Sequence, residues 1–585
     1  MKSIIVSSLL LLAFTQAAYA KVESSAKPSP HYDLSIKIIP DAHRIEVAGT
    51  LLLPPVNKLR SSIQIGLSNV MRALQVEVLE PKSCGGPAKL ERQRETDKMN
   101  VWTATPASAF PSGEAVKLRF SYAGGEEIRF VFYIGVEGSF AGGFNTAWYP
   151  QVEGDEKDEV AKSTARMLFS LPLEYKVIAT GKQLSGAEQE AKGDFVFETA
   201  QPSMLSFAAA KYLVQQHVSK SGIHMAAYLL RQRVHIKDYL ERCAEVMDVL
   251  VREFGPNPYG DFSLVEVPNE QSDKADFAGA SFEGFIMSNS SFLDQEFNTA
   301  YYGHEISRQW WGVSVGKTDG LRGNMMLSEA MAQYGSLRSV EILEGSRAAE
   351  QYRRVGYPGY VAMQNATGYF IVEAAGFDQP LSTLLQGPYT RILADGKGFI
   401  VYDMLSRTIG RDTFSLTLRN IARQYAGRAI GWDEFLEAIQ KGAGRDLKWF
   451  YQQWFEGKGA PEWDLSWKQE GDSVAGVITQ VQPCFRATLE LLIEGDEHQT
   501  SLQTIELRGE RTEFSFPVRF RARSLTVDPH FLVLNRTPQI RALKPAFRAC
   551  LRARPFDKNR ASSNCKNLFR KISGARQISR FWPAC

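Results

Sequence analysis

Cysteine is scarce in this sequence, which has six among its 585 residues. Three of them, Cys550, Cys565 and Cys585, lie close to the C-terminus, and the others are widely spaced. So few cysteines exclude a scaffold built on disulfides. Beyond residue 20 no apolar run is long enough to span a bilayer, which excludes a polytopic membrane protein. No glycine-rich phosphate loop and no Ser/His/Asp arrangement stands out either.

The composition is that of a globular chain, with 44% hydrophobic and 23% charged residues and a mean hydropathy of −0.23. Its length predicts about three to five domains. The net charge is +3, but residues 541–585 contain twelve basic residues and one acid, Asp557, so the rest of the chain is net negative. We expect this basic tail to be disordered. In one interpretation it holds an anionic surface, with no specific nucleic acid partner. The alternative is an extension without any partner.

The first twenty residues resemble a secretory signal peptide. Lys2 precedes an apolar run over residues 4–14, and Ala18-Tyr19-Ala20 forms a small-residue cleavage pattern. We expect cleavage after Ala20 and a soluble mature protein in a periplasm or outside the cell, without a transmembrane helix. The alternative is an uncleaved anchor, although the run is short for the roughly 20 residues that span a bilayer.

The spacing of apolar and polar residues changes twice along the chain. Alternating apolar and polar residues bounded by turn residues predict an all-β domain over residues 21–225. Helical spacing begins at His235 and dominates the predicted domain 226–460, whose first helix ends before Gly255. Alternation returns over 461–536, which predicts a small β-sandwich, followed by the basic tail 537–585.

Two short segments carry acids and a histidine that suit a metal site. The first contains His304, Glu305 and Arg308, and the second contains Glu329. On a helix, positions 304 and 308 lie one turn apart on the same face, as the two histidines of an H-E-x-x-H zinc motif do. Because the second histidine is replaced here by Arg308, the motif alone is weak.

The order and surroundings of these segments are similar to those of the zinc aminopeptidases of the membrane alanyl aminopeptidase (aminopeptidase N) family, which are gluzincin metallopeptidases. Gly279-Ala280-Ser281-Phe282-Glu283 resembles a loose version of the family's G-A-M-E-N motif. The resemblance covers roughly residues 31–535, and the segments that carry it are 254–268, 279–284, 304–312, 327–334, 397–410 and 453–461.

The resemblance implies an α+β multidomain fold: an N-terminal β-saddle, a thermolysin-like, mainly helical catalytic domain and a small C-terminal β-sandwich. It implies zinc as the cofactor and peptides as substrates. His304 matches the first metal ligand, Glu329 the third ligand and Glu305 the general base that activates water. Glu283 matches the acid that binds the free α-amine of the substrate.

Arg308 occupies the position of the second zinc ligand and contradicts the family pattern. A guanidinium has no lone pair to offer and stays protonated in proteins. A divalent ion about 4 Å away would be repelled by roughly 8 kcal/mol at an effective dielectric of about 20. We therefore expect Arg308 to supply the positive charge itself and to pair with Glu329 and Glu305. In the alternative, Arg308 swings away and water, His224 or His235 completes the metal shell.

The position of the family's transition-state tyrosine is also changed, since Asp395 precedes Lys397-Gly398 where the phenol is usual. An ionised carboxylate there would repel the oxyanion that the phenol stabilises. Tyr389 is a substitute candidate, with a packed loop aromatic as the alternative. Twenty residues separate Arg308 from Glu329, two more than is usual in the family, which an insertion over 316–323 would explain.

Two interpretations of the whole chain follow, and whether it is an enzyme stays open. In the first, an exported aminopeptidase-family protein has a degraded zinc site, is weak or inactive, and binds peptides with free N-termini. In the second, it is an active zinc aminopeptidase with an atypical metal shell. Glu283 either binds the amine or is simply solvated, and Trp310 and Trp311 either line a cleft or pack in the core.

Overall fold

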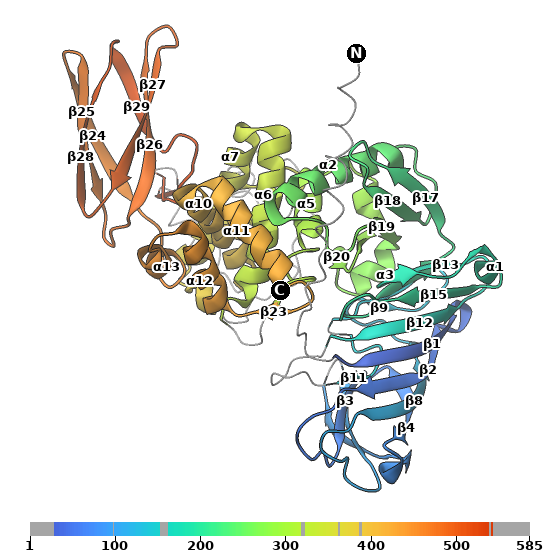
Figure 1. The fold of residues 1–585 in the computed structure, drawn as a ribbon. Helices are drawn as coiled ribbons and strands as arrows, with labels where there is room; N and C mark the ends of the chain where they lie inside the picture. The colour runs from blue at the N-terminus through green and yellow to red at the C-terminus, as the bar shows by residue number, and fades with distance from the viewer. Residues whose placement is uncertain are drawn as a thin grey trace, which may run out of the picture.

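The computed structural model describes residues 29–96, 99–144, 146–152, 162–317, 322–360, 363–384, 389–537 and 540–541. The predicted signal peptide and nearly all of the basic tail lie outside these residues. The described chain forms an N-terminal β domain, a mainly helical middle domain and a C-terminal β-sandwich (Figure 1). This is the predicted fold class. None of the helices in the described part is long and apolar enough to cross a membrane.

The N-terminal domain is built on an eight-stranded sheet in the order β14-β15-β12-β1-β2-β8-β4-β5. In β1 every second residue is buried, as the alternation of its sequence predicts. Two four-stranded sheets, β13-β16-β10-β9 and β11-β3-β7-β6, complete the domain. The strands are β1 (His31–Ile39), β2 (Arg44–Leu53), β3 (Ile63–Ser68), β4 (Met71–Glu80), β5 (Gly86–Pro87), β6 (Lys89–Glu95), β7 (Met99–Thr105), β8 (Val116–Gly124), β9 (Phe132–Tyr133), β10 (Ser139–Ala141), β11 (Gln151–Val152), β12 (Thr164–Ser170), β13 (Lys176–Ala179), β14 (Lys182–Gln183), β15 (Asp194–Glu198) and β16 (Phe207–Ala210).

The predicted boundary between residues 225 and 226 is wrong. Strands β17 (Leu213–Val218) and β18 (His224–Leu229) belong to a five-stranded sheet of the middle domain, in the order β17-β18-β19-β21-β20. In Figure 1 they lie beside β19 and above the N-terminal sheets. The period of a strand shows that one face is buried, but it does not show which sheet the strand joins. The N-terminal domain therefore ends near residue 212.

The first helices of the middle domain pack against this five-stranded sheet, and the later helices pack on other helices. The predicted first helix is confirmed as α2 (Ile236–Phe254), and Gly255 ends it with a φ of 98°. The remaining α-helices and strands are β19 (Phe262–Val267), α3 (Asn269–Lys274), β20 (Gly279–Phe282), β21 (Phe285–Asn289), α4 (Ser290–Leu293), α5 (Thr299–Ser307), β22 (Gly316–Lys317), α6 (Met331–Glu344), α7 (Ser346–Val355), α8 (Ala366–Ala374), α9 (Thr390–Leu393), α10 (Phe399–Ile409), α11 (Arg411–Gln424), β23 (Ala429–Ile430), α12 (Trp432–Ala443) and α13 (Lys448–Trp454).

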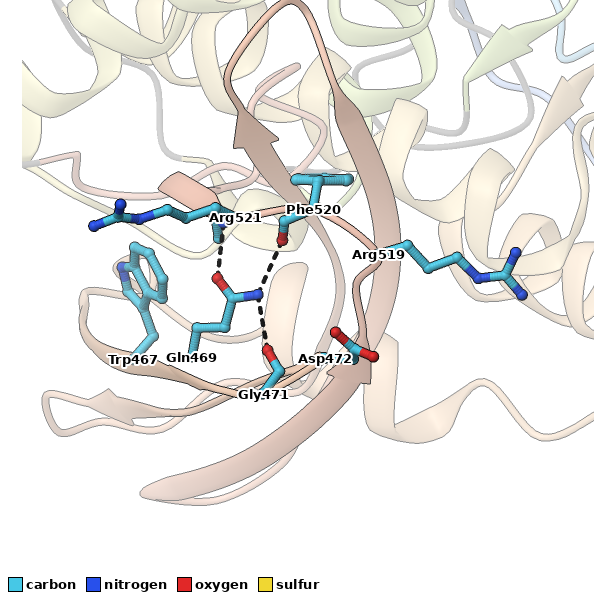
Figure 2. Close-up of a pocket in the computed structure, with 8 residues that line it drawn as sticks. Trp467, Gln469, Gly471, Asp472, Arg519, Phe520 and Arg521 are labelled. Carbon is cyan, nitrogen blue, oxygen red and sulfur yellow. Dashed lines mark hydrogen bonds between the residues drawn. The ribbon is translucent and has the colours of Figure 1, made fainter.

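The C-terminal domain consists of two three-stranded antiparallel sheets, β24-β25-β28 and β27-β26-β29. Its strands are β24 (Trp463–Glu470), β25 (Ser473–Gln480), β26 (Ala487–Gly495), β27 (Thr500–Leu507), β28 (Arg511–Pro517) and β29 (Ala522–Val527). Figure 2 shows a hollow in this domain, where the Gln469 side chain donates to the carbonyls of Gly471 and Phe520 and accepts from the backbone N–H of Ala522. The carboxamide of Gln469 thus ties β24 to the segment that leads into β29.

Candidate functional site

Helix α5 carries the first predicted site segment. Asn298 caps its N-terminus by accepting a hydrogen bond from the backbone of Tyr301. At the other end, the backbone N–H of Arg308 donates to the carbonyl of His304 at 3.2 Å, so these two residues keep helical spacing and share a face. Trp310 and Trp311 follow directly and are 1% and 0% exposed. They pack in the core, as the second interpretation of these residues predicts, and anchor the end of the helix.

Glu329 comes from the π-helical turn η3 (Met326–Ala330), which leads into α6. The helices α5 and α6 approach closely at Gly303, where an added Cβ would lie 2.8 Å from the Cα of Ser336. Single π-helical turns inside helices are frequent at functional sites. The close contact of α5 with α6 brings the Glu329 carboxylate over the face of α5 that carries His304 and Arg308.

Arg308 and Glu329 form the predicted ion pair, with Nη1 of Arg308 2.5 Å from Oε1 of Glu329. The second oxygen of Glu329 lies 3.5 Å from Nε2 of His304 and 3.7 Å from Nη2 of Arg391. Burial disfavours the ionised carboxylate, but Arg308, Arg391 and His304 outweigh burial and hold the pKa of Glu329 well below its usual value. Glu329 is therefore a carboxylate with three basic side chains around it.

His304 is oriented by a residue that the sequence analysis missed. Its Nδ1 lies 2.8 Å from Oε1 of Gln333, and the amide nitrogen of Gln333 donates to the hydroxyl of Tyr352 at 2.6 Å. Because an amide oxygen only accepts, Nδ1 of His304 carries the proton and Nε2 faces Glu329. Burial lowers the pKa of His304, but the hydrogen bond with Glu329 and the charges of the nearby acids outweigh it, so the pKa is raised. Position 333 is one helical turn beyond Glu329, and that spacing is the signal that could have indicated it.

The carboxylate of Glu305 is hydrogen-bonded to Ser281 rather than paired with Arg308. Its Oε2 accepts from the hydroxyl of Ser281 at 2.5 Å, and the same hydroxyl lies 2.8 Å from the backbone oxygen of Glu305. Ser281 belongs to β20, in the segment that precedes Glu283. The expected pairing of Arg308 thus holds for Glu329, while Glu305 is held by the edge strand of the sheet.

Glu283 lies in the turn between β20 and β21 and is 7% exposed. The alternative of a simply solvated glutamate is therefore wrong. Its Oε1 accepts from the backbone N–H of Met204, a residue of the N-terminal domain, at 3.0 Å. Burial raises the pKa of Glu283, while the charge of Lys162 opposes that shift. The candidate amine-binding carboxylate is thus enclosed between two domains.

Gln309 fixes the turn that carries Glu283. Its Nε2 donates to the carbonyl of Phe282 at 3.0 Å, and its Oε1 accepts from the backbone N–H of Gly284 at 2.9 Å. Gln309 is 0% exposed and directly follows Arg308. The end of α5 therefore sets the position of the turn.

Asp395 is 0% exposed and lies in a second π-helical turn, η5 (Ala394–Gly398). Its Oδ2 accepts from Nε2 of Gln364 at 2.9 Å, and its Oδ1 has no hydrogen-bond partner among the described residues. Burial and the charge of Glu329 raise the pKa of Asp395 to about 7. The ring of Tyr389, the candidate substitute, packs 4.7 Å from that of Phe377 just before α9.

The comparisons with known proteins fit this geometry. Residues 285–454 match the family described as the peptidase family M1 domain. The middle of this chain is thus similar to a peptidase family M1 domain. This match includes α5, η3 and η5, which carry His304, Glu305, Glu329 and Asp395. Among curated proteins, the comparison finds no match.

Two solved structures that are similar to this chain are peptidases. Aminopeptidase A of Legionella pneumophila, in complex with aspartic acid, aligns with a TM-score of 0.61 and 15% identity over 88% of this chain and 60% of its own. An M1 zinc metallopeptidase variant from Deinococcus radiodurans aligns with a TM-score of 0.54 and 16% identity over 74% of this chain and 96% of its own. At such identities the likeness shows a shared fold. The protein described here spans 60% of the length of the Legionella chain.

The residues at the position that the resemblance assigns to zinc do not fit a zinc ion. His304 and Glu329 offer one nitrogen and one carboxylate, but the carboxylate is already paired with Arg308, a cation that has no lone pair. Within the described ranges, no three His, Cys, Asp or Glu side chains gather as a metal shell. His224 and His235, the alternative ligands, lie exposed at the start of β18 and just before α2, on elements other than those that hold His304 and Glu329.

Proposed function

We propose that this protein binds peptides through their free N-terminus without a metal and hydrolyses them weakly or not at all. The 2.5 Å contact between Arg308 and Glu329 supports this proposal most directly. A permanent guanidinium charge neutralises the carboxylate that would otherwise bind zinc. The electrophile of a metallopeptidase is thereby replaced by a fixed side-chain cation that does not activate water.

The buried carboxylate of Glu283 supports a ligand with a free amine. Burial at the β20–β21 turn raises the pKa of Glu283 and disfavours its ionised form, so a cationic group bound beside it would stabilise the carboxylate. The Legionella aminopeptidase A structure holds aspartic acid, which has such an amine. The ligand proposed for this chain is therefore a short peptide whose ammonium group reaches Glu283.

Calorimetric titration of the full chain in excess chelator tests this proposal. Trialanine should bind, and N-acetyl-trialanine should bind at least about tenfold more weakly, because a blocked amine cannot pair with Glu283. Glu283→Gln should remove this preference, while the matched variant Glu270→Gln, an exposed residue paired with Lys274, should keep it. Equal affinity for the two peptides would refute the role of Glu283.

An active aminopeptidase with an atypical metal shell is the second candidate. His304 and Glu305 lie on α5, and Glu329 on η3 lies close to His304, so three of the expected site residues are present together. It requires bound zinc, release of N-terminal residues that chelator stops, and loss of that release in Glu305→Gln. Chelator-sensitive release of alanine from trialanine by the wild-type protein, absent in Glu305→Gln, would establish this second candidate and reject the first.

We also propose that the protein is exported and that its basic tail binds an anionic surface. Both proposals rest on the sequence, since residues 1–20 carry the signal pattern and residues 541–585 the positive charge. Deleting the tail should lower retention on a polyanionic resin at low salt without changing peptide binding.

A further inference from the structure

The hydroxyl of Tyr360 reaches the candidate site through Gln333, although no motif indicates this residue. Tyr360 follows α7, and its hydroxyl donates to Oε1 of Gln333 at 3.3 Å. The same oxygen accepts from Nδ1 of His304 at 2.8 Å. One amide oxygen thus joins the phenol to the histidine at the first zinc-ligand position.

The charges around Tyr360 place it among the acids of the site. Burial and Tyr352 raise the pKa of Tyr360 well above its usual value, and Asp395, Glu305 and Glu329 raise it further. These three acids come from η5, α5 and η3, so negative charge from three elements acts on the phenol. At neutral pH the hydroxyl therefore keeps its proton and remains a donor.

The hydrogen bond that Tyr360 makes is weak enough to be exchanged for one to a ligand. At 3.3 Å it is longer than the usual 2.5–3.0 Å of an O–H···O hydrogen bond. If Tyr360 turns to a ligand, the oxygen of Gln333 still accepts from His304. Tyr352 differs, because it is 0% exposed and its hydroxyl lies 2.6 Å from Gln333 and 2.8 Å from Ser336.

The geometry points to Tyr360 as the residue that donates a hydrogen bond to the carbonyl oxygen of the ligand's first peptide bond. It supplies the phenol that the Asp395 position lacks, from a different segment of the chain. This inference rests on the proposed function, because Glu283 must hold the ammonium group for the first carbonyl to reach the middle of the site. Since no bond is broken, Tyr360 acts in binding.

A ligand pair that differs in one oxygen atom tests the inference. Trialanine and an analogue with an (E)-alkene in place of the first peptide bond are titrated into the wild-type protein and Tyr360→Phe, in chelator. Loss of one hydrogen bond should weaken trialanine binding about three- to tenfold and leave the affinity for the alkene unchanged. Tyr357→Phe is the matched control, since its hydroxyl bonds Glu344 and not Gln333.

The outcomes separate this inference from the proposed function. If Tyr360→Phe weakens both ligands equally, or neither, Tyr360 does not contact the carbonyl and the inference is overturned. If the wild-type protein binds neither ligand, the proposed function itself fails and the inference falls with it. Matching unfolding temperatures of the two variants and the wild-type protein exclude misfolding as the cause of a lost affinity.

Discussion

Nη1 of Arg308 lies 2.5 Å from Oε1 of Glu329, and the two side chains are 22% and 11% exposed. The pair joins the end of α5 to the turn that leads into α6, at the position that the family resemblance assigns to zinc. A metal shell contributes to folding by linking elements through one cation. In this chain the cation that links the two elements is the side chain of Arg308, so the link forms without a metal ion.

Removal of the Arg308 side chain should therefore destabilise the protein. Arg308→Ala leaves Glu329 buried without its closest partner, which typically costs about 3–5 kcal/mol. The free energy of unfolding in urea measures this loss. The matched control is Arg391→Ala, since Arg391 is 67% exposed and 3.7 Å from Glu329, and it should cost less than about 1 kcal/mol. A loss below about 1 kcal/mol for Arg308→Ala would mean that the pair is not structural.

The metal content of the protein should depend on the residue at position 308. The wild-type chain should retain almost no zinc after dialysis against zinc and then metal-free buffer, because Arg308 repels the ion. Arg308→His removes that charge and adds a nitrogen one turn from His304, which gives a His, His and Glu set with Glu329. Elemental mass spectrometry should then find zinc in the variant. About one zinc in each wild-type chain would reject the proposed role of Arg308.

The sequence predicts the architecture well where one period extends over a long segment. The alternation of β1 and the helical spacing of α2 are local, and both elements are present. The Arg308–Glu329 pair was also predictable. A helix places position 308 on the same face as His304, and the opposite charges of Arg308 and Glu329 favour an ion pair there. In contrast, the sheet that β17 and β18 join depends on long-range pairing, which the period does not contain.

The parts of the site that the sequence does not predict are set by contacts between distant segments. Tyr360 follows Gln333 by 27 positions and reaches it only because α7 turns back along α6. The burial of Glu283 depends on Met204 in another domain. In the sequence, Asp395 is recognised only as a replacement for the family's tyrosine. Its burial and its raised pKa depend on how η5 packs, which the sequence does not show.

Asp395 should make the stability of the protein depend on pH. Its pKa is about 7 in the folded protein and close to 3.8 when unfolded, so the folded state keeps the proton longer. The unfolding free energy should therefore fall as the pH rises from about 4 to about 7 and stay low above that. Asp395→Asn has no such proton to lose, so it should exceed the wild-type stability at pH 8 by roughly 2–4 kcal/mol.

Asp403 is the matched control for Asp395, because it is also an aspartate with 0% exposure. Burial raises its pKa, but Arg411, Arg353 and Arg407 outweigh burial and hold the pKa of Asp403 well below its usual value. Asp403→Asn should thus destabilise the protein at pH 8, and its effect should shrink only at pH values below about 4. Urea unfolding from pH 4 to pH 8 compares the variants. Parallel curves for Asp395→Asn and the wild-type protein would contradict the shifted pKa of Asp395.

Gln309 should control both the stability of the β20–β21 turn and the amine preference of the site. Gln309→Leu leaves the carbonyl of Phe282 and the N–H of Gly284 without partners in a buried place, and each group costs about 1–3 kcal/mol. Glu283 lies between these two groups, so its carboxylate should lose its fixed position and with it the preference for trialanine over N-acetyl-trialanine.

Gln309→Glu keeps the acceptor for Gly284 and can donate to Phe282 only when protonated. Its amine preference should therefore be closer to the wild-type value at pH 5 than at pH 8, whereas Gln309→Leu should show no such recovery. Equal preferences in both variants and the wild-type protein would show that the turn holds Glu283 without Gln309.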